Sequence, residues 1–430
     1  MFANLKGLFS PTNKDLRKRI LFTLVCLAIY ALGTNIIVPG AKSITKNIGF
    51  LELLNLMSGG SLKNFSIFAL GVMPYISATI ITQLFQMDII PYFKELKEQG
   101  ATGQQKLNRI NRYLGILFAI IQGYVFSYAF LNNAGSMEIV KTTLYLTAGT
   151  SFLLWLGDEI TRKGIGNGMS LIIMAGIVNT LPNTFITAFR ELVLSASYST
   201  WTGIILFALF VAIYILIVVG VIYTQGAERR VPIQYSNRTT GAYGGEKSFI
   251  PIKLNASGVV PVIFASAIIG IPSLIGEVIK NDAFNKFVDK YIVYTSYTGF
   301  LIYMFLIFLF GYFYTLLQLN PDEMAENLDK NRGYIPGVTP GEKTSKHLKF
   351  VITRVTVVGT LFLMILAAMP IIFSKITSLS SITSLGGTGL LIVVGVALET
   401  YKQLESSIVS RSYTGRRKGR MRRRWKILFL

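Results

Sequence analysis

Charged side chains are scarce in this sequence of 430 residues. Only 15% of the residues are Asp, Glu, Lys or Arg, whereas 52% are hydrophobic and the mean hydropathy is +0.52. A water-soluble domain of this length does not need so apolar a composition to fill its core. The balance therefore predicts an integral membrane protein.

The sequence is equally poor in reactive side chains, with one cysteine and one histidine. A single cysteine excludes a disulfide within the chain and a cysteine-based metal site, and Cys26 stands in an apolar run typical of a buried thiol. His347 stands in a charged stretch, and metal ligands usually come in clusters. We therefore expect no metal, no cofactor and no histidine-based catalysis. The basic start of the chain runs directly into an apolar stretch of full span length, which does not resemble a cleavable signal peptide.

Long apolar runs bounded by polar breaks predict transmembrane helices. We expect an all-α membrane protein with ten spans, of which the fourth and tenth are short. The predicted spans cover residues 20–38, 66–86, 113–131, 144–156, 168–186, 201–223, 257–279, 298–319, 351–373 and 387–400.

Lys and Arg are distributed unevenly between these spans. With the N-terminus in the cytoplasm, 33 of the 42 Lys and Arg residues fall in cytoplasmic segments and 9 fall on the other side. This asymmetry predicts that both termini lie in the cytoplasm. It also concentrates the net charge of +21 where nucleic acid, anionic lipid or an acidic protein could meet it.

Two cytoplasmic connections are longer than a turn requires. Residues 224–255 alternate Val231, Ile233 and Tyr235 with polar residues before a glycine-rich tip, a pattern typical of a hairpin. Residues 320–350 combine a short helical stretch near residues 322–328 with two Pro-Gly turns. Loops of this length are usually functional or disordered. The two interpretations are partner-binding arms and plain solvated loops.

An interrupted motif occurs in the second span of each five-span half. Gly71-Val72-Met73-Pro74 stands in the first half and Gly258-Val259-Val260-Pro261 in the second, and the two spans cross the membrane in opposite directions. The fifth and tenth spans likewise open with Gly-x-Gly. Broken apolar segments at corresponding places indicate inverted repeats with a site at their interface.

Polar residues and helix breakers at membrane depth are tolerated only where they face protein or water. The second and seventh spans are therefore expected to line an internal passage. Gly59-Gly60 separates the short apolar run 50–57 from the second span, which leaves a half-helix too short to cross. We interpret this half-helix as a candidate plug.

Six stretches of the sequence, in order along almost the whole chain, resemble the bacterial SecY family of protein-translocation channels. They are SGGSLKNFSIFALGVMPYISATII, WLGDEITRKGIGNGMSLIIMAGIV, IPIKLNASGVVPVIFASAII, NPDEMAENL, GYIPGVTPGE and LGGTGLLIVVGVALETYKQLES. The resemblance implies two inverted five-helix halves, residues 1–200 and 201–410, which form an hourglass channel with a lateral gate. A basic tail follows at residues 411–430, for which a disordered segment and a contact with anionic lipid or RNA are the two interpretations.

The resemblance also implies roles for individual residues. It implies a pore ring of Val72, Ile76, Ile173, Ile263 and Ile392. It implies a plug at residues 51–64, including Leu51, Leu54, Met57, Gly59, Gly60 and Asn64. The lateral gate would consist of Ile76, Ile80 and Gln83 facing Ile263 and Ala267, with Asn255 near the cytoplasmic end.

The same resemblance implies binding partners for the two cytoplasmic connections, the predicted arms. The motor ATPase SecA or the ribosome would dock at Arg229, Arg230, Lys253, Thr339 and Lys343. Thr339 and the Gln104-Gln105 pair stand where the family commonly has arginine, which weakens the expected docking there. Further implied partners are the SecE and SecG subunits, signal peptides and unfolded preproteins, and anionic lipids, but not DNA. The implied location is the cytoplasmic membrane.

Two other function classes compete with a protein channel. A secondary transporter also shows inverted repeats, but coupling usually needs ionisable residues at the midplane, and residues 66–86 and 257–275 contain none. An enzyme is disfavoured, because GYIPGVTPGEKT lacks the strand–helix frame of a phosphate-binding loop.

Overall fold

The computed structural model describes residues 14–40, 55–86, 90–131, 135–194, 199–235, 248–279, 281–294, 296–377 and 389–408. It is a helical protein with one small sheet. Its first helices are α1 (Lys14–Gly33), α3 (Met73–Phe85), α4 (Pro91–Glu98), α5 (Ala101–Phe130), α6 (Ser136–Lys163), α7 (Gly168–Phe189) and the π-helical turn η3 (Arg190–Leu194). The later ones are α8 (Thr200–Gly226), α9 (Val260–Ile279), α10 (Asp282–Tyr291), α11 (Tyr297–Gln318), α12 (Pro321–Lys330), α13 (Glu342–Thr377) and helix 389–408.

A helix lies in each of the ten predicted spans. Six helical stretches of the described chain are long and apolar enough to cross a membrane, and they begin with α5, α6, α7, α8, α11 and α13. The helices in the other four spans are α1, α3, α9 and helix 389–408. The chain is therefore a multi-pass membrane protein.

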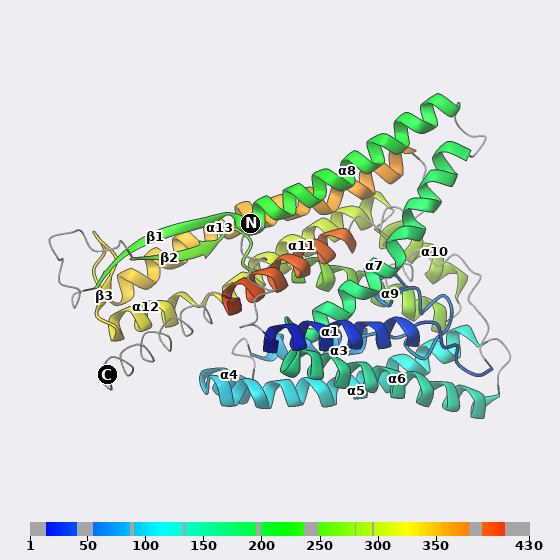
Figure 1. The fold of residues 1–430 in the computed structure, drawn as a ribbon, viewed down its shortest axis with the longest axis horizontal. Helices are drawn as coiled ribbons and strands as arrows, with labels where there is room; N and C mark the ends of the chain where they lie inside the picture. Colours follow the sequence, from blue (N-terminus) through cyan, green and yellow to red (C-terminus); the bar gives the residue numbers. More distant parts are fainter. Residues whose placement is uncertain are drawn as a thin grey trace, which may run out of the picture.

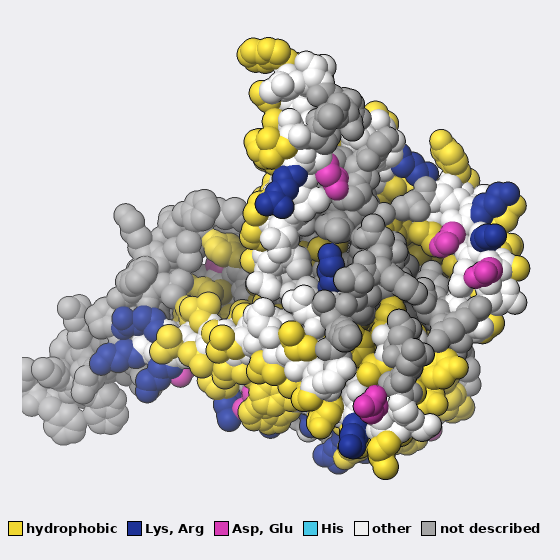
Figure 2. Space-filling view, turned by 90° about the vertical axis from the view of Figure 1, so that its right-hand side faces the viewer, with side chains coloured by type: hydrophobic (Ala, Val, Ile, Leu, Met, Phe, Trp, Pro, Cys, Tyr) yellow, Lys and Arg dark blue, Asp and Glu magenta, His cyan; other side chains and the backbone are white. Residues whose placement is uncertain are grey.

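The long helices lie in two groups that run along the longest axis of the molecule. Figure 1 shows α1, α3, α5 and α6 on one side, and α8, α11 and α13 on the other. The sheet and α12 project from one end of the molecule, here called the arm end, and α10 lies at the opposite end. Figure 2 looks onto that opposite end, where acidic and basic side chains are scattered among hydrophobic ones.

Two predicted spans are helical over only part of their length. The span predicted at residues 20–38 ends its helix at Gly33, and the span predicted at residues 66–86 is helical only from Met73. Gly33 packs so closely on Phe68 that a Cβ atom there would lie 2.0 Å from the ring. After Gly33 the chain turns at Thr34 and Asn35, and Ile37 then pairs with Ser66 as an isolated antiparallel bridge. Backbone hydrogen bonds between the two irregular segments thus replace the missing helical ones.

The inverted motif folds in the same way in both halves. Gly71 and Gly258 have positive φ angles of 54° and 62°, which break any preceding helix at a residue without a Cβ atom. α3 and α9 then begin two residues later, and each has proline as its second residue. Proline suits this position because the first helical N–H groups have no partner within the helix.

The fifth and tenth predicted spans pack against each other in antiparallel fashion. A Cβ atom on Gly166, before α7, would lie 3.1 Å from Thr400 Oγ1. One on Gly389, at the start of helix 389–408, would lie 2.9 Å from Ile177 of α7. The small residues at the two starts therefore allow close approach at both ends of the pair.

The two connections predicted to be cytoplasmic join in one structure at the arm end. β1 (Glu228–Tyr235) pairs antiparallel with β2 (Ser248–Lys253), as the hairpin pattern predicts, and β3 (Gly333–Tyr334) adds to the other edge of β1. Val231 and Ile233 are buried against residues of α12 and α13. The sequence predicted the hairpin and the helix α12 but not the strand that links them.

The close contact between α6 and the irregular segment before α3 yields a stability prediction. A Cβ atom on Gly149 would lie 2.1 Å from the carbonyl oxygen of Ile67, so Gly149→Ala forces the backbone apart. We expect a loss of about 1–3 kcal/mol, typical of overpacking. Thermal unfolding of the purified protein in detergent measures the loss. Gly135→Ala is the matched control, because nothing lies within 4 Å of a Cβ atom there. Equal unfolding temperatures for the two variants would contradict the packing described.

Candidate functional site

Five branched aliphatic residues from four separate elements are buried in the largest apolar cluster of the molecule. They are the residues of the predicted pore ring: Val72, Ile76, Ile173, Ile263 and Ile392, with exposed fractions of 3–8%. Ile76 lies on α3, Ile173 on α7 and Ile263 on α9, so the cluster joins both halves of the chain. None of these side chains can form a hydrogen bond or carry charge.

A polar cavity of about 490 Å³ lies directly against this cluster. Ile173, Ile263 and Ile392 form part of its lining. The remaining wall is largely polar and includes Asn167, Ser170, Gln225, Lys253, Asn255, Ser257, Gln318, Glu399, Lys402 and Gln403. Because Gln225 lies near the end of α8 that leads into β1, and Lys253 ends β2, the cavity lies on the side of the molecule that carries the arm end. The structure therefore places a partly polar cavity against one side of the apolar cluster.

Local hydrogen bonds fix the polar wall of this cavity. Asn167 caps α7 by accepting hydrogen bonds from the N–H groups of Met169 and Ser170. Asn255 donates to the carbonyl of Gly258 and accepts from the hydroxyl of Ser257, which shapes the turn before α9.

Lys402 ties helix 389–408 to the end of α8. Its Nζ donates to the carbonyl of Gln225 at 2.9 Å. Partial burial, and secondly the charge of Lys253, lower the pKa of Lys402. This hydrogen bond thus joins helix 389–408 to the end of α8 at the cavity wall.

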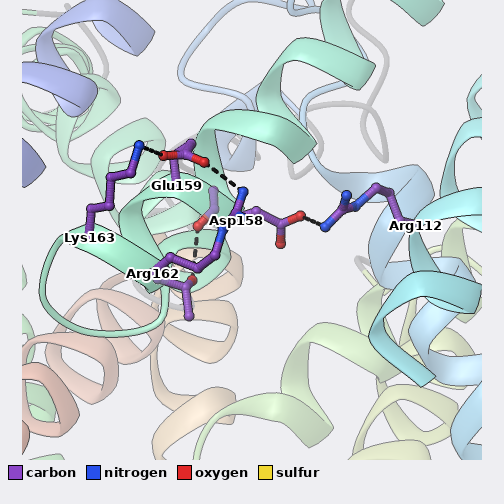
Figure 3. Close-up of polar contacts among 7 residues, drawn as sticks. Arg112, Asp158, Glu159, Arg162 and Lys163 are labelled. Carbon is purple, nitrogen blue, oxygen red and sulfur yellow. Dashed lines mark hydrogen bonds and ion pairs between the residues drawn. The ribbon is translucent and has the colours of Figure 1, made fainter. Parts of the chain in front are cut away.

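A cluster of ion pairs lies at the C-terminal end of α6, just before the turn that leads into α7. Figure 3 shows Glu159 between Arg162 and Lys163, at 2.6 Å and 2.7 Å, and Asp158 paired with Arg112 of α5. The spacing of Glu159 from its two partners is typical of pairs within one helix. The pair with Arg112 bridges two helices, so nothing in the local sequence pattern indicates it.

The turn from α6 to α7 is held by two threonines. The N–H of Ile165 donates to Thr23 Oγ1 of α1 at 3.1 Å, and the N–H of Gly168 donates to Thr161 Oγ1 at 2.9 Å. These contacts place the start of α7, and with it Ser170 and Ile173, against the cavity.

A second cavity, of about 330 Å³ and mostly apolar, lies between α3, α5 and α9. Ile80 and Ala267, two of the predicted gate residues, line it from α3 and α9. Phe118, Gln122 and Phe126 line it from α5, a contribution that the sequence did not indicate. Its polar groups include Ser77 and Gln122, whose side chains form a long hydrogen bond of 3.4 Å.

Two other predicted gate residues lie elsewhere. Gln83 is half-buried on α3 and interacts with Tyr314 of α11. Asn255 lines the polar cavity instead of the apolar one. The predicted gate therefore spans both cavities.

The predicted plug residues are described only from residue 55 onward. Leu51 and Leu54 lie outside the described residues. Met57 and Gly59 are buried, Gly60 is half-buried and Asn64 is exposed. Residues 55–64 form one short helical turn followed by further turns that pack on α7.

The predicted docking residues all lie exposed at the arm end. They are Arg229, Arg230, Lys253, Thr339 and Lys343, and Gln104 and Gln105 are exposed as well. Arg230 is already engaged, since it pairs with Glu228 at 2.7 Å and its guanidinium lies 4.7 Å from the centre of the Phe249 ring. Lys253 lines the polar cavity and also lies opposite Glu228, beside Arg229, in the pairing of β1 and β2.

Comparison with known proteins decides the family. The family model for SecY matches residues 66–401. The chain belongs to the SecY family. It is 42% identical to the protein translocase subunit SecY of Bacillus subtilis (strain 168), covering 93% of this chain and 96% of that one. It is 41% identical to the SecY subunit of Staphylococcus aureus (strain NCTC 8325 / PS 47), covering 94% and 97%. SecY proteins are translocation channels, which agrees with an apolar cluster from both halves of the chain beside a polar cavity.

Solved structures support the same fold. A protein described as a protein-conducting channel superposes with a TM-score of 0.66 at 20% identity, covering 92% of this chain and 93% of that one. Canine Sec61 in a ribosome–channel complex from the endoplasmic reticulum superposes with a TM-score of 0.61, with the same coverage and identity. The fold expected for the SecY family is thereby confirmed.

The different lining of the two cavities predicts different labelling by a charged thiol reagent. Ser170→Cys places a thiol in the polar cavity, and Ser77→Cys places one in the apolar cavity. In a Cys26→Ser background, we expect a charged maleimide to label position 170 rapidly and position 77 at least about tenfold more slowly, because a charged reagent avoids an apolar cavity. Mass spectrometry of protein in sealed vesicles, with reagent added on the arm side, measures both rates. Similar rates would show that water fills both cavities alike.

Proposed function

We propose that this chain is a protein-conducting channel that translocates unfolded secretory polypeptides across the cytoplasmic membrane and releases hydrophobic segments sideways into the bilayer. The observation that carries the proposal is the lining of the polar cavity by Ile173, Ile263 and Ile392, since these residues come from both halves of the chain. Family membership supports the same function.

The apolar ring acts as the neck of the channel. Branched aliphatic side chains around a narrow opening exclude water and ions by dewetting, and they offer a passing peptide no strong binding site. Val72 and Ile76 complete the ring from the first half. The neck thus seals without charge and lets varied sequences pass.

The plug segment, residues 51–64, closes the neck on the side away from the arms. Its described part packs on α7 beyond Ile173, and a carbonyl of this part, that of Met57, approaches Gly176, one helical turn along. A solved relative by fold, with a TM-score of 0.62, is described as having a plug domain that stabilises the closed state and maintains a membrane seal. We assign the same role to residues 51–64 of this chain.

The lateral gate lies where α3 meets α9. Ile76 and Ile80 of α3 face Ile263 and Ala267 of α9, with Gln83 and Asn255 toward the arm end. Each Leu or Ile of a passing segment gains about 0.3–0.6 kcal/mol in the bilayer centre, so about ten such residues offset an opening cost of a few kcal/mol. Polar segments lack this gain and continue through the neck.

The arm end faces the cytoplasm, and both chain termini lie on that side. The distribution of Lys and Arg supports this orientation. The two halves, residues 1–200 and 201–410, move about the junction between η3 and α8. There a Cβ atom on Gly203 would lie only 2.2 Å from the carbonyl of Leu192, which keeps the halves in contact.

Partners dock on the arms and at the edges of the bundle. Arg229, Arg230, Lys253 and Lys343 meet the phosphates of ribosomal RNA or an acidic patch of the SecA motor. Thr339 contributes less than an arginine would. SecE and SecG complete the complex, and the basic tail, residues 411–430, meets anionic lipid.

The chain is not an enzyme in this proposal. Energy for translocation comes from a partner or from the membrane potential. The uncharged neck disfavours the alternative of a secondary transporter, because residues 66–86 and 257–275 contain no ionisable side chain to couple ions to a solute.

A channel whose ring residues lack side chains is expected to conduct ions at rest. We expect the triple variant Ile76→Gly, Ile173→Gly and Ile263→Gly to conduct small ions at rest, because water then enters the neck. Planar-bilayer conductance of the resting complex measures the leak. The control variant has the same number of isoleucine-to-glycine substitutions, placed at the exposed Ile205, Ile215 and Ile365. Its channel is expected to stay closed. Unchanged conductance of the ring variant would refute the gating role.

A translocating chain should contact the ring and the gate. We expect an arrested secretory nascent chain carrying one cysteine to crosslink to cysteines at Ile76 and Ile263, because both positions line its path. A cysteine at Leu216, exposed on the outer face of α8, is the control and is expected to remain uncrosslinked. Crosslinking followed by gel electrophoresis gives the yield for each position. Yields at the control position equal to those at the ring would place the path elsewhere.

A further inference from the structure

The described part of the plug segment ends its helical turn with two glycines that turn the chain toward α7. Gly59 and Gly60 have φ angles of 74° and 84°, a conformation that side chains rarely allow. The N–H of Gly59 donates to the carbonyl of Leu56, and that of Gly60 to the carbonyl of Asn55. Their own N–H groups are thus satisfied within the segment, whereas the carbonyl of Gly59 is left for a partner outside it.

Asn179 of α7 supplies that partner. Its Nδ2 donates to the carbonyl of Gly59 at 3.0 Å. Among the residues that the structure describes, this is the only hydrogen bond between residues 55–64 and a transmembrane helix. The segment is otherwise held by packing and by bonds to its own neighbours in sequence.

The bond forms on the face of α7 that also carries the ring. Ile173, Gly176 and Asn179 follow one another at intervals of three residues, so they lie on one side of the helix. Gly176 allows the segment to come close, since a Cβ atom there would lie 2.6 Å from the carbonyl of Met57 and 3.0 Å from the nitrogen of Gly59. The segment therefore rests on α7 one turn beyond the ring, with Asn179 as its polar attachment.

Tyr30 of α1 lies at the same place, but its hydroxyl group destabilises the attachment of residues 55–64 to α7. Its side chain is 1% exposed and stacks on Phe68, with ring centres 6.1 Å apart. Its hydroxyl lies next to Gly59 and Gly176, yet it has no hydrogen-bond partner in the described chain. A buried hydroxyl without a partner destabilises the arrangement that buries it.

We propose that Asn179 determines how firmly the plug segment is held shut, and so how hydrophobic a targeting segment must be to open the channel, with the Tyr30 hydroxyl acting against it. The inference rests on the proposed function. An incoming segment opens the channel only by its differential affinity for the open state. When the closed state loses one hydrogen bond, a less hydrophobic segment is enough.

The experiment compares two reporters in cells whose only copy of this subunit is the variant under test. One reporter carries an intact hydrophobic signal, and the other carries a signal shortened in its apolar part. The measured quantity is the exported fraction of the weak reporter divided by that of the strong one. A misfolded channel lowers both fractions and cannot raise this ratio.

Asn179→Ala removes the donor and is expected to raise the ratio about twofold to tenfold, which corresponds to one net hydrogen bond. Tyr30→Phe removes the unpaired hydroxyl and is expected to lower the ratio. Asn183→Ala, the same substitution about one turn further along α7, is the matched control and is expected to leave it unchanged, since Asn183 donates no hydrogen bond to residues 55–64.

A ratio for Asn179→Ala equal to that of the parent, with the strong reporter exported normally, overturns the inference and leaves the proposed function intact. A ratio that rises equally in Asn179→Ala and Asn183→Ala also overturns it, because the hydrogen bond to Gly59 is then irrelevant. If the parent chain exports neither reporter, the proposed function itself is wrong.

Discussion

The structure depends on one constraint, which is that backbone polar groups at membrane depth must find partners inside the protein. Residues 58–72 are not helical, yet most of them are buried. The N–H of Ile67 donates to the carbonyl of Ile36, and the hydroxyl of Ser61 donates to the carbonyl of Phe68. Closely packed glycines, such as Gly149 against Ile67, admit this irregular chain between the helices. A lipid-facing position would leave these groups without partners.

The same irregular segments set the position of the apolar cluster that contains the predicted ring residues. Gly71 and Gly258 interrupt the chain just before α3 and α9, so that each helix starts inside the protein and not at its surface. Ile76 and Ile263 are then carried to the level where α7 and helix 389–408 contact each other. The segments of lowest helix propensity therefore position the apolar side chains that a channel needs at its centre.

The arm end packs closely on a helix that carries a predicted ring residue. A Cβ atom on Gly359 of α13 would lie 1.9 Å from the carbonyl of Leu254, and one on Gly395 would lie 2.8 Å from Val259. The connection between β2 and α9 thus packs against two helices, one of which carries Ile392.

The sequence alone determined the membrane class, the presence of a helix in each of the ten predicted spans, the inverted motif and the hairpin, because hydropathy, glycine and proline act through local physical rules. Resemblance to the SecY family added the ring residues, and all five lie in one apolar cluster. Tertiary structure alone decided where α1 ends and where α3 begins, since Phe68 packing on Gly33 and the pairing of Ile37 with Ser66 join distant segments. It also decided the strand that links the two arms, the part of α5 in the apolar cavity and the bond from Asn179 to Gly59. Each of these depends on contacts between residues far apart in the chain, which no periodicity within one segment encodes.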